Sequence, residues 1–274
     1  MRILDGKKLS EKILKNLRRE IERLKLKLTL GIIQVGENKV SEVYINSKKR
    51  ASQKIGIGFQ VFKFPEDIGK EKLKKEIEKI VNSPSISGVI IQLPMPKEYS
   101  PEEFLNLIPS EKDIDLLSEK SLGKFYQGKS KILPPTVSGI LKLLKSGKVK
   151  LKGKNVVIFG AGRLVGFPLS LVLVREKATV SVLNEFTKDV SYFTQKADII
   201  ISGVGKPNLV RGEMVKRGVV IIDAGTSKVK GKLVGDVDFK SVSKKASLIT
   251  PVPGGVGPMT VASLLENLVK LNKK

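Results

Sequence analysis

Short apolar runs alternate along the chain with longer amphipathic segments in which apolar residues recur every three or four positions. The short runs are typical of buried strands and the amphipathic segments are typical of helices. In the first half the predicted strands cover residues 29–35, 60–64 and 88–92, and the predicted helices cover residues 7–26, 40–55 and 70–82. Strands that alternate with helices predict an α/β protein with a parallel sheet.

A second series of predicted strands follows Lys154, at residues 155–159, 179–183, 199–202, 219–223 and 248–249. Between the two series, residues 94–135 are rich in turns, with a short helix predicted at 101–107 and an acidic cluster of Glu111, Asp113 and Asp115. A helix at 138–146 links the halves, which places the boundary near Thr136. We therefore expect one domain at 1–136 and a second at 137–260, with the closing helix, 261–274, packing back on the first.

Composition narrows the chemistry that this protein can perform. The chain has 274 residues, of which 41% are hydrophobic, and it contains neither cysteine nor histidine. These absences exclude disulfides, thiolate catalysis and cysteine-ligated zinc, and they remove the commonest metal ligand and general base. Acid–base chemistry must therefore come from Lys, Tyr, Asp or Glu, and we expect no metal. No apolar run approaches a membrane span or the core of a signal peptide, so we expect a soluble, cytoplasmic protein without a membrane partner.

The net charge of +24 is compatible with nucleic-acid binding, because such an excess of positive charge attracts polyanions. The lysines are spread along the chain and mixed with glutamate, and the densest basic stretch, 142–154, has no interleaved aromatic residues for base stacking. We interpret the lysines as solvated faces suited to high temperature and expect no nucleic-acid partner. A basic surface still favours small anionic substrates.

A glycine-rich turn follows the predicted strand 155–159, with the sequence Gly160-Ala161-Gly162-Arg163-Leu164-Val165-Gly166. Between a strand and a helix, such a turn is typical of the Rossmann site, where glycines let the backbone approach a pyrophosphate. Its spacing, G-x-G-x-x-x-G, departs from the standard G-x-G-x-x-G. The alternative is a glycine-rich turn that only packs a helix on a sheet.

Glu185 lies just past the next predicted strand, where Rossmann domains place an acidic residue. A carboxylate there accepts hydrogen bonds from the adenosine ribose and repels a 2′-phosphate, which favours NAD over NADP. Arg163 and Lys188 offset that repulsion, and Glu185 can also be a solvated loop residue.

Further glycines follow the later strands, in Ser202-Gly-Val-Gly205-Lys-Pro207 and in Asp223-Ala-Gly225. Both segments are expected at the carboxyl ends of the sheet, where α/β proteins bind ligands. The segment Thr250-Pro-Val-Pro-Gly-Gly-Val-Gly-Pro-Met-Thr260 is so dense in Pro and Gly that we expect a rigid loop rather than a regular element.

Taken together, these motifs resemble those of the methylene-tetrahydrofolate dehydrogenase/cyclohydrolase family, the bifunctional FolD enzymes. The resemblance spans nearly the whole chain in order: Val35-Gly36 through Tyr44-Ile-Asn-Ser-Lys48, Gln92-Leu-Pro-Met-Pro96, Lys112-Asp-Ile-Asp115, Gly235-Asp-Val-Asp238 and the segment 250–260. It implies two α/β domains with a cleft between them, the first binding folate and the second binding NAD(P) on a Rossmann fold. It also implies a homodimer joined through the cofactor domain.

This sequence departs from the family pattern at several places. Leu116 stands where a glycine usually follows the second aspartate, and Pro134-Pro-Thr-Val-Ser-Gly139 replaces Pro-Cys-Thr-Pro-x-Gly. Gly160-Ala161-Gly162 replaces Gly-Arg-Ser, and Leu183-Asn-Glu185 replaces Cys-His-Ser. The last two changes fall where the family holds the 2′-phosphate of NADP, so they agree with a preference for NAD.

The implied activity is the NAD(P)-dependent oxidation of 5,10-methylene-tetrahydrofolate, followed by hydrolysis to 10-formyl-tetrahydrofolate, in one-carbon metabolism. Tyr44 and Lys48 lie one helical turn apart on one face of the predicted helix 40–55, for which Ser41 is a candidate cap and Gly56 a natural C′ residue. The resemblance implies that Tyr44 stacks on the substrate and that Lys48 is the catalytic amine. On composition alone, Lys48 is an ordinary surface lysine.

The remaining expected roles also follow from the resemblance. Gln92 orients the Lys48 amine, although alone it is an ordinary residue at a strand end, and Asp115 hydrogen-bonds the aminopyrimidine edge of the pterin. Asp113 is instead expected to be a cap or turn residue. The other expected substrate contacts are Pro251, Gly254 and Gly255, and the expected cofactor contacts are Gly160, Ala161, Gly162, Arg163, Val165, Gly166, Glu185, Gly205 and Thr226.

Two other functions compete with the bifunctional enzyme. The changes at Leu116 and near Thr136 motivate an NAD-dependent dehydrogenase with little cyclohydrolase activity. The charge motivates a basic polyanion-binding protein with an inactive Rossmann domain, which the intact Tyr44, Lys48, Gln92 and Asp115 argue against.

Overall fold

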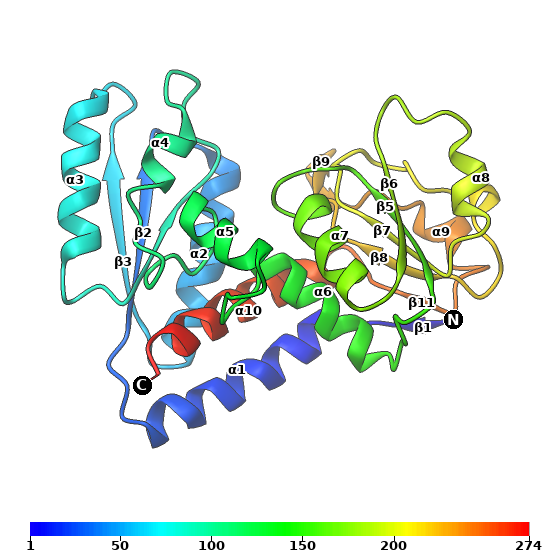
Figure 1. The fold of residues 1–274 in the computed structure, drawn as a ribbon, viewed down its shortest axis with the longest axis horizontal. Coiled ribbons are helices and arrows are strands. Elements are labelled where there is room, and N and C mark those ends of the chain that lie inside the picture. Colours follow the sequence, from blue (N-terminus) through cyan, green and yellow to red (C-terminus); the bar gives the residue numbers. More distant parts are fainter. Residues whose placement is uncertain (274) are drawn as a thin grey trace. The chain divides into compact units, whose positions relative to one another are not determined.

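The computed structural model describes residues 1–273, apart from the side chains of Lys39 and Val40, and the chain forms two compact units. One combines residues 1–10 with residues 136–260, and the other combines residues 11–135 with the segment that begins at Val261. We call them the six-stranded unit and the three-stranded unit after their main sheets and describe each by itself (Figure 1). None of the described helices has the length and apolar character that crossing a membrane requires.

A parallel sheet in the order β3–β2–β4 forms the centre of the three-stranded unit. Its strands are β2 (Thr29–Val35), β3 (Gly58–Phe64) and β4 (Gly88–Ile91). The helices of these residues are α2 (Lys39–Lys54), α3 (Lys70–Asn82), α4 (Pro101–Leu105) and α5 (Glu119–Tyr126), and most of α1 (Gly6–Arg23) and α10 (Val256–Leu271) also belongs here. Strand β2 has a hydrogen-bonded neighbour on each edge, and its residues are almost all buried.

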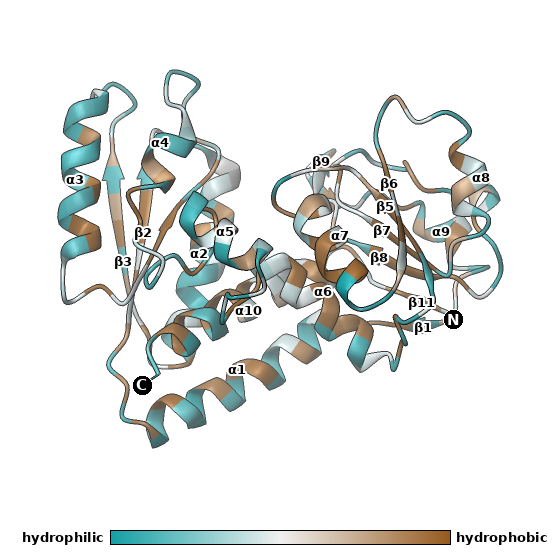
Figure 2. Ribbon diagram, in the orientation of Figure 1, coloured by the Kyte–Doolittle hydropathy of each residue, from teal (hydrophilic) through white to brown (hydrophobic). Residues whose placement is uncertain are grey.

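Apolar side chains cover both faces of this sheet. Successive residues of β2 point to opposite faces, so Leu30 and Ile32 belong to one buried cluster whereas Ile33 and Val35 belong to another. The first cluster includes residues of α1, α2 and α10, and the second includes residues of α3 and α4. Figure 2 shows β2 largely in the hydrophobic colour and α3 mostly in the hydrophilic colour with hydrophobic patches. Burial on both faces is what a parallel sheet requires.

The six-stranded unit contains a parallel sheet in the order β1–β11–β8–β7–β5–β6. Its strands are β1 (Arg2–Ile3), β5 (Asn155–Phe159), β6 (Thr179–Leu183), β7 (Ile199–Ser202), β8 (Val220–Asp223) and β11 (Leu248–Ile249). The accompanying elements are α6 (Pro135–Ser146), α7 (Gly166–Arg175), α8 (Val190–Thr194), a 3₁₀ turn (Gly212–Met214), the hairpin β9 (Ser227–Val229) and β10 (Lys232–Val234), and α9 (Phe239–Val242).

The carboxyl ends of four neighbouring strands lie level with one another. Phe159 of β5 pairs with Leu183 of β6 on one side and with Ser202 of β7 on the other, and Ser202 pairs with Asp223 of β8. The loops that follow these strands therefore meet at one edge of the sheet. In open α/β sheets this is the edge that binds ligands. We therefore call the edge at which Phe159, Leu183, Ser202 and Asp223 lie the ligand edge.

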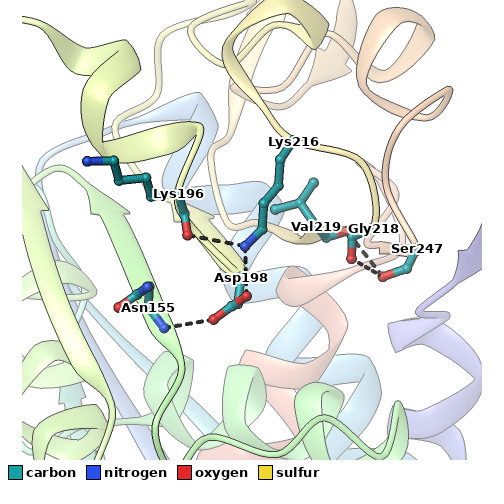
Figure 3. A network of polar contacts seen from close by, with 7 residues as sticks. All are labelled: Asn155, Lys196, Asp198, Lys216, Gly218, Val219 and Ser247. Carbon is teal, nitrogen blue, oxygen red and sulfur yellow. Dashed lines mark hydrogen bonds and ion pairs between the residues drawn. The ribbon is translucent and has the colours of Figure 1, made fainter.

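Asp198 fixes the opposite, amino-terminal edge of the same sheet (Figure 3). One of its carboxylate oxygens accepts the backbone N–H of Asn155 at 3.0 Å, and the other accepts the ammonium of Lys216 at 2.8 Å. Lys216 also donates to the Lys196 carbonyl at 3.2 Å. Partial burial opposes ionisation of Asp198, but these hydrogen bonds outweigh it and keep its pKa below the usual value. The amino ends of β5 and β7 are thus joined at a distance from the ligand edge.

The predicted α/β class with parallel sheets is confirmed, and so are most elements. Five strands and one helix have the predicted bounds, at residues 29–35, 155–159, 179–183, 199–202, 248–249 and 70–82. Strand β1, helices α5, α8 and α9 and the β9–β10 hairpin were not predicted. These missed elements are two to eight residues long and lack the continuous apolar run that marks equally short strands such as 199–202.

Two local predictions were wrong. The segment 250–260 is not irregular throughout, because α10 begins at Val256; Pro258 is tolerated there since the N–H groups of a first helical turn have no partner within the helix. The cap of α2 is Asn38 rather than Ser41: the Asn38 side-chain oxygen accepts the backbone N–H of Ser41 at 3.0 Å. Gly56, with φ of 78°, follows the end of α2 as expected.

Candidate active site

A lysine amine and a glutamine amide meet in the three-stranded unit. The Nζ of Lys48, on α2, donates to Oε1 of Gln92 at 2.9 Å. Gln92 directly follows β4, and its own Nε2 donates to the carbonyl of Leu93 at 2.7 Å. Because the amide nitrogen is engaged with Leu93, the amide oxygen faces the lysine. The amine is thus held by a neutral acceptor, the arrangement that an orienting role requires.

The backbone around this pair is fixed by neighbouring hydrogen bonds. The N–H of Gln92 donates to the carbonyl of Ile33 at 2.8 Å, which extends the pairing of β4 with β2 by one residue. The peptide bond between Leu93 and Pro94 is cis. Tyr44 lies one turn before Lys48 on α2, and its side chain is 37% exposed, so the ring is accessible to a ligand.

Asp115 is the charged neighbour of Lys48. Burial lowers the pKa of Lys48, and the opposite charge of Asp115 only partly restores it. Burial likewise raises the pKa of Asp115, and Asp113 raises it further, whereas Lys48 lowers it. Both shifts favour the uncharged form, so the Lys48 amine is available to accept a proton nearer neutral pH than an exposed lysine.

Asp113 has a structural role, as expected. It is 1% exposed, and its carboxylate accepts the backbone N–H groups of Leu116, Leu117 and Ser118 together with the Ser118 hydroxyl. Leu116, which stands where the resembled family has glycine, is buried and has a φ of 60°. A leucine in this left-handed region is strained by about 1 kcal/mol. The Asp113 hydrogen bonds help hold it there.

The glycine turn after β5 has the geometry of a dinucleotide site. Gly160 has a φ of 91°, and a Cβ on Gly166 would overlap the Gly160 carbonyl oxygen, so both positions need glycine. Gly162, by contrast, faces open space. Helix α7 begins at Gly166 without a side-chain cap, because Val165 occupies the cap position. An uncapped helix start beside a close backbone turn fits a pyrophosphate.

Glu185 is exposed in the turn that follows β6. Asn184 and Thr187 fix this turn, since the Asn184 side chain accepts the Phe186 N–H at 3.0 Å and the Thr187 hydroxyl accepts the Asn184 N–H at 3.0 Å. The turn shares the ligand edge with the glycine turn, because β5 and β6 end level with one another. Ala161, Arg163 and Val165 belong to that glycine turn.

A buried carboxylate, Asp236, shapes the loop after β7. It is 0% exposed and accepts the backbone N–H groups of Val204, Gly205 and Lys206 at 2.8–2.9 Å, together with the Ser202 hydroxyl at 2.7 Å. Gly205 has a φ of 83°. Its carbonyl accepts the hydroxyl of Ser227, which follows the exposed Thr226. Gly205 and Thr226 are thereby brought together on the ligand edge.

Asp223, at the end of β8, is a second buried carboxylate beside Asp236. Its oxygens accept the backbone N–H groups of Gly225, Asp236 and Val237 at 3.0–3.1 Å. A Cβ on Gly225 would overlap the Asp236 carboxylate, and one on Gly235 would overlap that of Asp223. Burial raises the pKa of Asp223 to about 6.

The segment after β11 also reaches the ligand edge of the six-stranded unit. Thr250 accepts the backbone N–H of Asp223 on its hydroxyl at 2.7 Å, and the Gly254 carbonyl accepts the N–H of Lys7 at 2.8 Å. Gly255 lies so close to Pro251 that a Cβ would be 2.5 Å from the Pro251 carbonyl oxygen. Pro251, Gly254 and Gly255 belong to the six-stranded unit, whereas Tyr44, Lys48, Gln92 and Asp115 belong to the three-stranded unit.

The roles of Asp223 and Asp236 were missed at the level of sequence. Both lie within glycine-flanked segments that were noted, 223–225 and 235–238, but neither residue was assigned a function. The available signal was the glycine beside each acid, because a residue without Cβ makes room for a buried carboxylate.

A lysine made less basic by burial in one α/β unit and a dinucleotide-type turn in the other together define an NAD(P)-dependent enzyme of two domains. The chain belongs to the tetrahydrofolate dehydrogenase/cyclohydrolase family: residues 4–115 match the family's catalytic domain, and residues 134–274 match its NAD(P)-binding domain.

Similar proteins match over nearly their whole length. The chain is 46% identical to the bifunctional protein FolD of Nautilia profundicola, covering 100% of this chain and 98% of that one. The crystal structure of FolD from Campylobacter jejuni is similar with a TM-score of 0.96 and 43% identity, covering 99% of this chain and 98% of that one. FolD of Trypanosoma brucei, solved with NADP and an inhibitor, is similar with a TM-score of 0.92 and 35% identity, covering 97% of this chain and 95% of that one.

The raised pKa of Asp223 predicts a specific pH dependence of stability. The folded protein binds this proton more tightly than the unfolded chain, so the stabilising contribution is complete below pH about 4 and is lost as the pH rises through 6. This rise in the pKa of Asp223 corresponds to a change of about 3 kcal/mol in the unfolding free energy. Urea unfolding at pH 4–7 should show this fall in the unfolding free energy for the wild type and a profile flatter by that amount for Asp223→Asn. The exposed Glu213→Gln should retain the fall, and an equal slope in all three proteins would contradict the assignment.

Proposed function

We propose that this protein oxidises 5,10-methylene-tetrahydrofolate to the 5,10-methenyl cation with NAD(P)⁺ and then hydrolyses the cation to 10-formyl-tetrahydrofolate. The observation that carries the proposal is the Lys48–Gln92 hydrogen bond beside Asp115. It occurs in a chain whose relatives are bifunctional over their full length. The intact amine and its orienting amide favour both activities over a dehydrogenase that lacks the second.

The nucleotide is proposed to bind at the ligand edge of the six-stranded unit. The close approach of Gly160 to Gly166 and the uncapped start of α7 support a pyrophosphate there. When bound, the nicotinamide accepts the hydride from the folate methylene carbon. The residues proposed to surround the nucleotide are Gly160, Ala161, Gly162, Arg163, Val165, Gly166, Glu185, Gly205 and Thr226.

The pterin is proposed to bind beside the exposed ring of Tyr44 and the partly exposed Asp115. The Tyr44 ring offers a stacking surface, and the Asp115 carboxylate offers two oxygens for the paired N–H donors of the aminopyrimidine edge. Pro251, Gly254 and Gly255 are proposed as further substrate contacts. Their mutual packing gives them a fixed backbone.

Lys48 is proposed to move the proton in the hydrolytic step. As water adds to the methenyl carbon, the neutral amine accepts a proton from it, and the resulting ammonium returns that proton to the ring nitrogen when the carbon–nitrogen bond breaks. A second proton leaves to solvent, because the cationic substrate becomes a neutral product. The burial that lowers the Lys48 pKa makes the amine available for the first transfer, and Gln92 keeps it in place.

Removal of the amine should therefore abolish hydrolysis. We expect Lys48→Met to reduce the rate of methenyl-tetrahydrofolate hydrolysis, followed by loss of its absorbance, by at least about 100-fold. Gln92→Leu should give a smaller loss of about tenfold, since it leaves the amine present but not oriented.

Lys49→Met is the matched control, because Lys49 is exposed on the same helix, and it should keep the wild-type rate. Hydrolysis by Lys48→Met at the wild-type rate would remove Lys48 from the mechanism. Oxidation without methenyl hydrolysis in the wild type would favour the monofunctional dehydrogenase.

We infer that NAD⁺ is preferred to NADP⁺. Glu185 is exposed at the tip of a fixed turn on the ligand edge, where its charge would repel a 2′-phosphate. Ala161 and Gly162 provide no cationic or hydroxyl side chain to offset that charge, although Arg163 and Lys188 lie nearby in sequence.

Neutralising Glu185 should change the nucleotide preference. We expect Glu185→Gln to lower the KM for NADP⁺ by about tenfold and to raise that for NAD⁺ a few-fold, in steady-state assays with either nucleotide. Glu176→Gln, an exposed change after α7, should leave the ratio unaltered. A wild-type ratio in the Glu185 variant would assign that carboxylate to solvent.

We propose that two copies of the chain associate through the six-stranded unit. Strand β6 lies at the edge of its sheet. Exposed apolar residues lie on it and on the flanking segments: Val182 of β6 is 36% exposed, Val174 of α7 58%, and Phe186 in the turn after β6 83%. An unpaired edge with apolar neighbours is a surface for pairing with a second copy. A cytoplasmic location remains a prediction from the sequence.

Light scattering should give a mass of twice the 30.0 kDa chain. Val182→Lys should shift the protein toward monomer, because it introduces a charge at the proposed interface, whereas Val229→Lys, also at an exposed valine, should not. A wild-type monomer at micromolar concentration would exclude this interface.

A further inference from the structure

Asn267 is a polar residue on the buried face of α10. Its side chain is 1% exposed, and Leu264, Leu265 and Leu268 around it belong to the apolar cluster of the three-stranded unit. Burying an amide among apolar side chains is unfavourable unless its hydrogens find acceptors. An apolar residue of similar size would pack at this position without that requirement, so the hydrogen bonds of Asn267 point to its role.

The amide nitrogen of Asn267 joins two segments that are distant in sequence. Nδ2 donates to the carbonyl of Ile114 at 3.0 Å and to the carbonyl of Leu133 at 2.8 Å. Both hydrogens are thus used on backbone acceptors, and one of these acceptors belongs to the residue immediately before Asp115.

This hydrogen bond acts on the orientation of Asp115 through the peptide plane. The carbonyl of Ile114 and the N–H of Asp115 belong to one planar peptide group, so fixing the carbonyl fixes the direction in which the chain enters Asp115. On the other side, the N–H of Leu116 donates to Asp113 at 2.9 Å, with a φ of 60° at Leu116. Asp115 is therefore anchored by α10 on one side and by Asp113 on the other.

Side-chain packing also brings α10 against Ile114, the residue before Asp115. A Cβ on Gly88 would lie 2.6 Å from the Leu268 side chain and 2.8 Å from the Ile114 side chain, so the missing Cβ lets both approach β4. Ile114 is 0% exposed in the same cluster as Leu268. Its side chain and its carbonyl are therefore both held by residues of α10.

We infer that Asn267 is a positioning residue for the substrate: by holding the Ile114 carbonyl it aims the Asp115 carboxylate at the aminopyrimidine edge of the pterin, and so sets the affinity for folate without touching it. The inference rests on the proposed function, in which Asp115 binds that edge. Its consequence is that an amide in the core of α10 affects folate binding but not nucleotide binding.

Asn272 offers a matched control on the same stretch of chain. It directly follows α10, and its Nδ2 also donates to two backbone carbonyls, those of Ser87 at 3.1 Å and Leu268 at 2.8 Å. It therefore makes the same kind of bond from a partly buried position, but to α10 itself and to the segment before β4 rather than to the residue before Asp115. A purely structural effect of losing such an amide should appear in both variants.

The test is steady-state kinetics of the full chain with methylene-tetrahydrofolate and nucleotide. We expect Asn267→Leu to raise the folate KM about tenfold, with kcat and the nucleotide KM within about twofold of wild type. Asn272→Leu should keep the wild-type folate KM. In an Asp115→Ala background, adding Asn267→Leu should change the folate KM by less than about twofold, because the residue acts through Asp115. Asn267→Ser, a smaller change in the core, gives the same comparison if the leucine variant does not fold.

Three results would overturn the inference: an unchanged folate KM in the folded Asn267 variant, the same rise in Asn272→Leu, or an undiminished rise in the Asp115→Ala background. Failure of the proposed function would look different, since the wild type and Asn272→Leu would then show no turnover of methylene-tetrahydrofolate with either nucleotide.

Discussion

Buried carboxylates that collect backbone N–H groups hold the functional loops in both units. Asp113 accepts the N–H groups of three successive residues, 116–118, and Asp236 accepts those of residues 204–206. Each loop departs from regular structure, so its amides have no ladder or helix to satisfy them, and an unpaired buried N–H is costly. One carboxylate with several lone pairs satisfies them together. The glycines and the left-handed residues around these sites can therefore be rigid without being regular, and the proposed contacts of Asp115 and Gly205 depend on that rigidity.

The proposed mechanism arranges proton transfer in a chain that contains no histidine. An exposed lysine is protonated at neutral pH, but burial at Lys48 lowers the cost of losing that proton, and the accompanying Asp115 is itself shifted toward neutrality. A neutral amine also avoids repelling a cationic substrate. Gln92 suits this environment because an amide acceptor orients the amine without adding a charge that would restore its basicity.

Local sequence predicted the fold well and the site in part. Strands such as 155–159 and 199–202 are nearly continuous apolar runs between turns, and the one-turn spacing of Tyr44 and Lys48 gave one face of a helix. The bond from Lys48 to Gln92 spans 44 residues and that from Asn267 to Ile114 spans 153, so only family resemblance anticipated the first and nothing anticipated the second. Prolines and glycines misled the prediction at Val256, because a first helical turn tolerates them. The cap of α2 was misplaced by three residues for a similar reason, since Asn38 and Ser41 are both good caps.

The pairing of Arg2–Ile3 with Leu248–Ile249 has a consequence for how the chain is made. During synthesis, the first strand of the six-stranded sheet leaves the ribosome some 245 residues before its neighbour, which is most of a minute at low translation rates of about 5 residues per second. Residues 29–91 have by then supplied all three strands of the other sheet. Contacts of such long sequence separation form slowly because a large loop must close first. The amino-terminal strand must therefore wait exposed, and its length of two residues leaves little edge for association with other nascent chains.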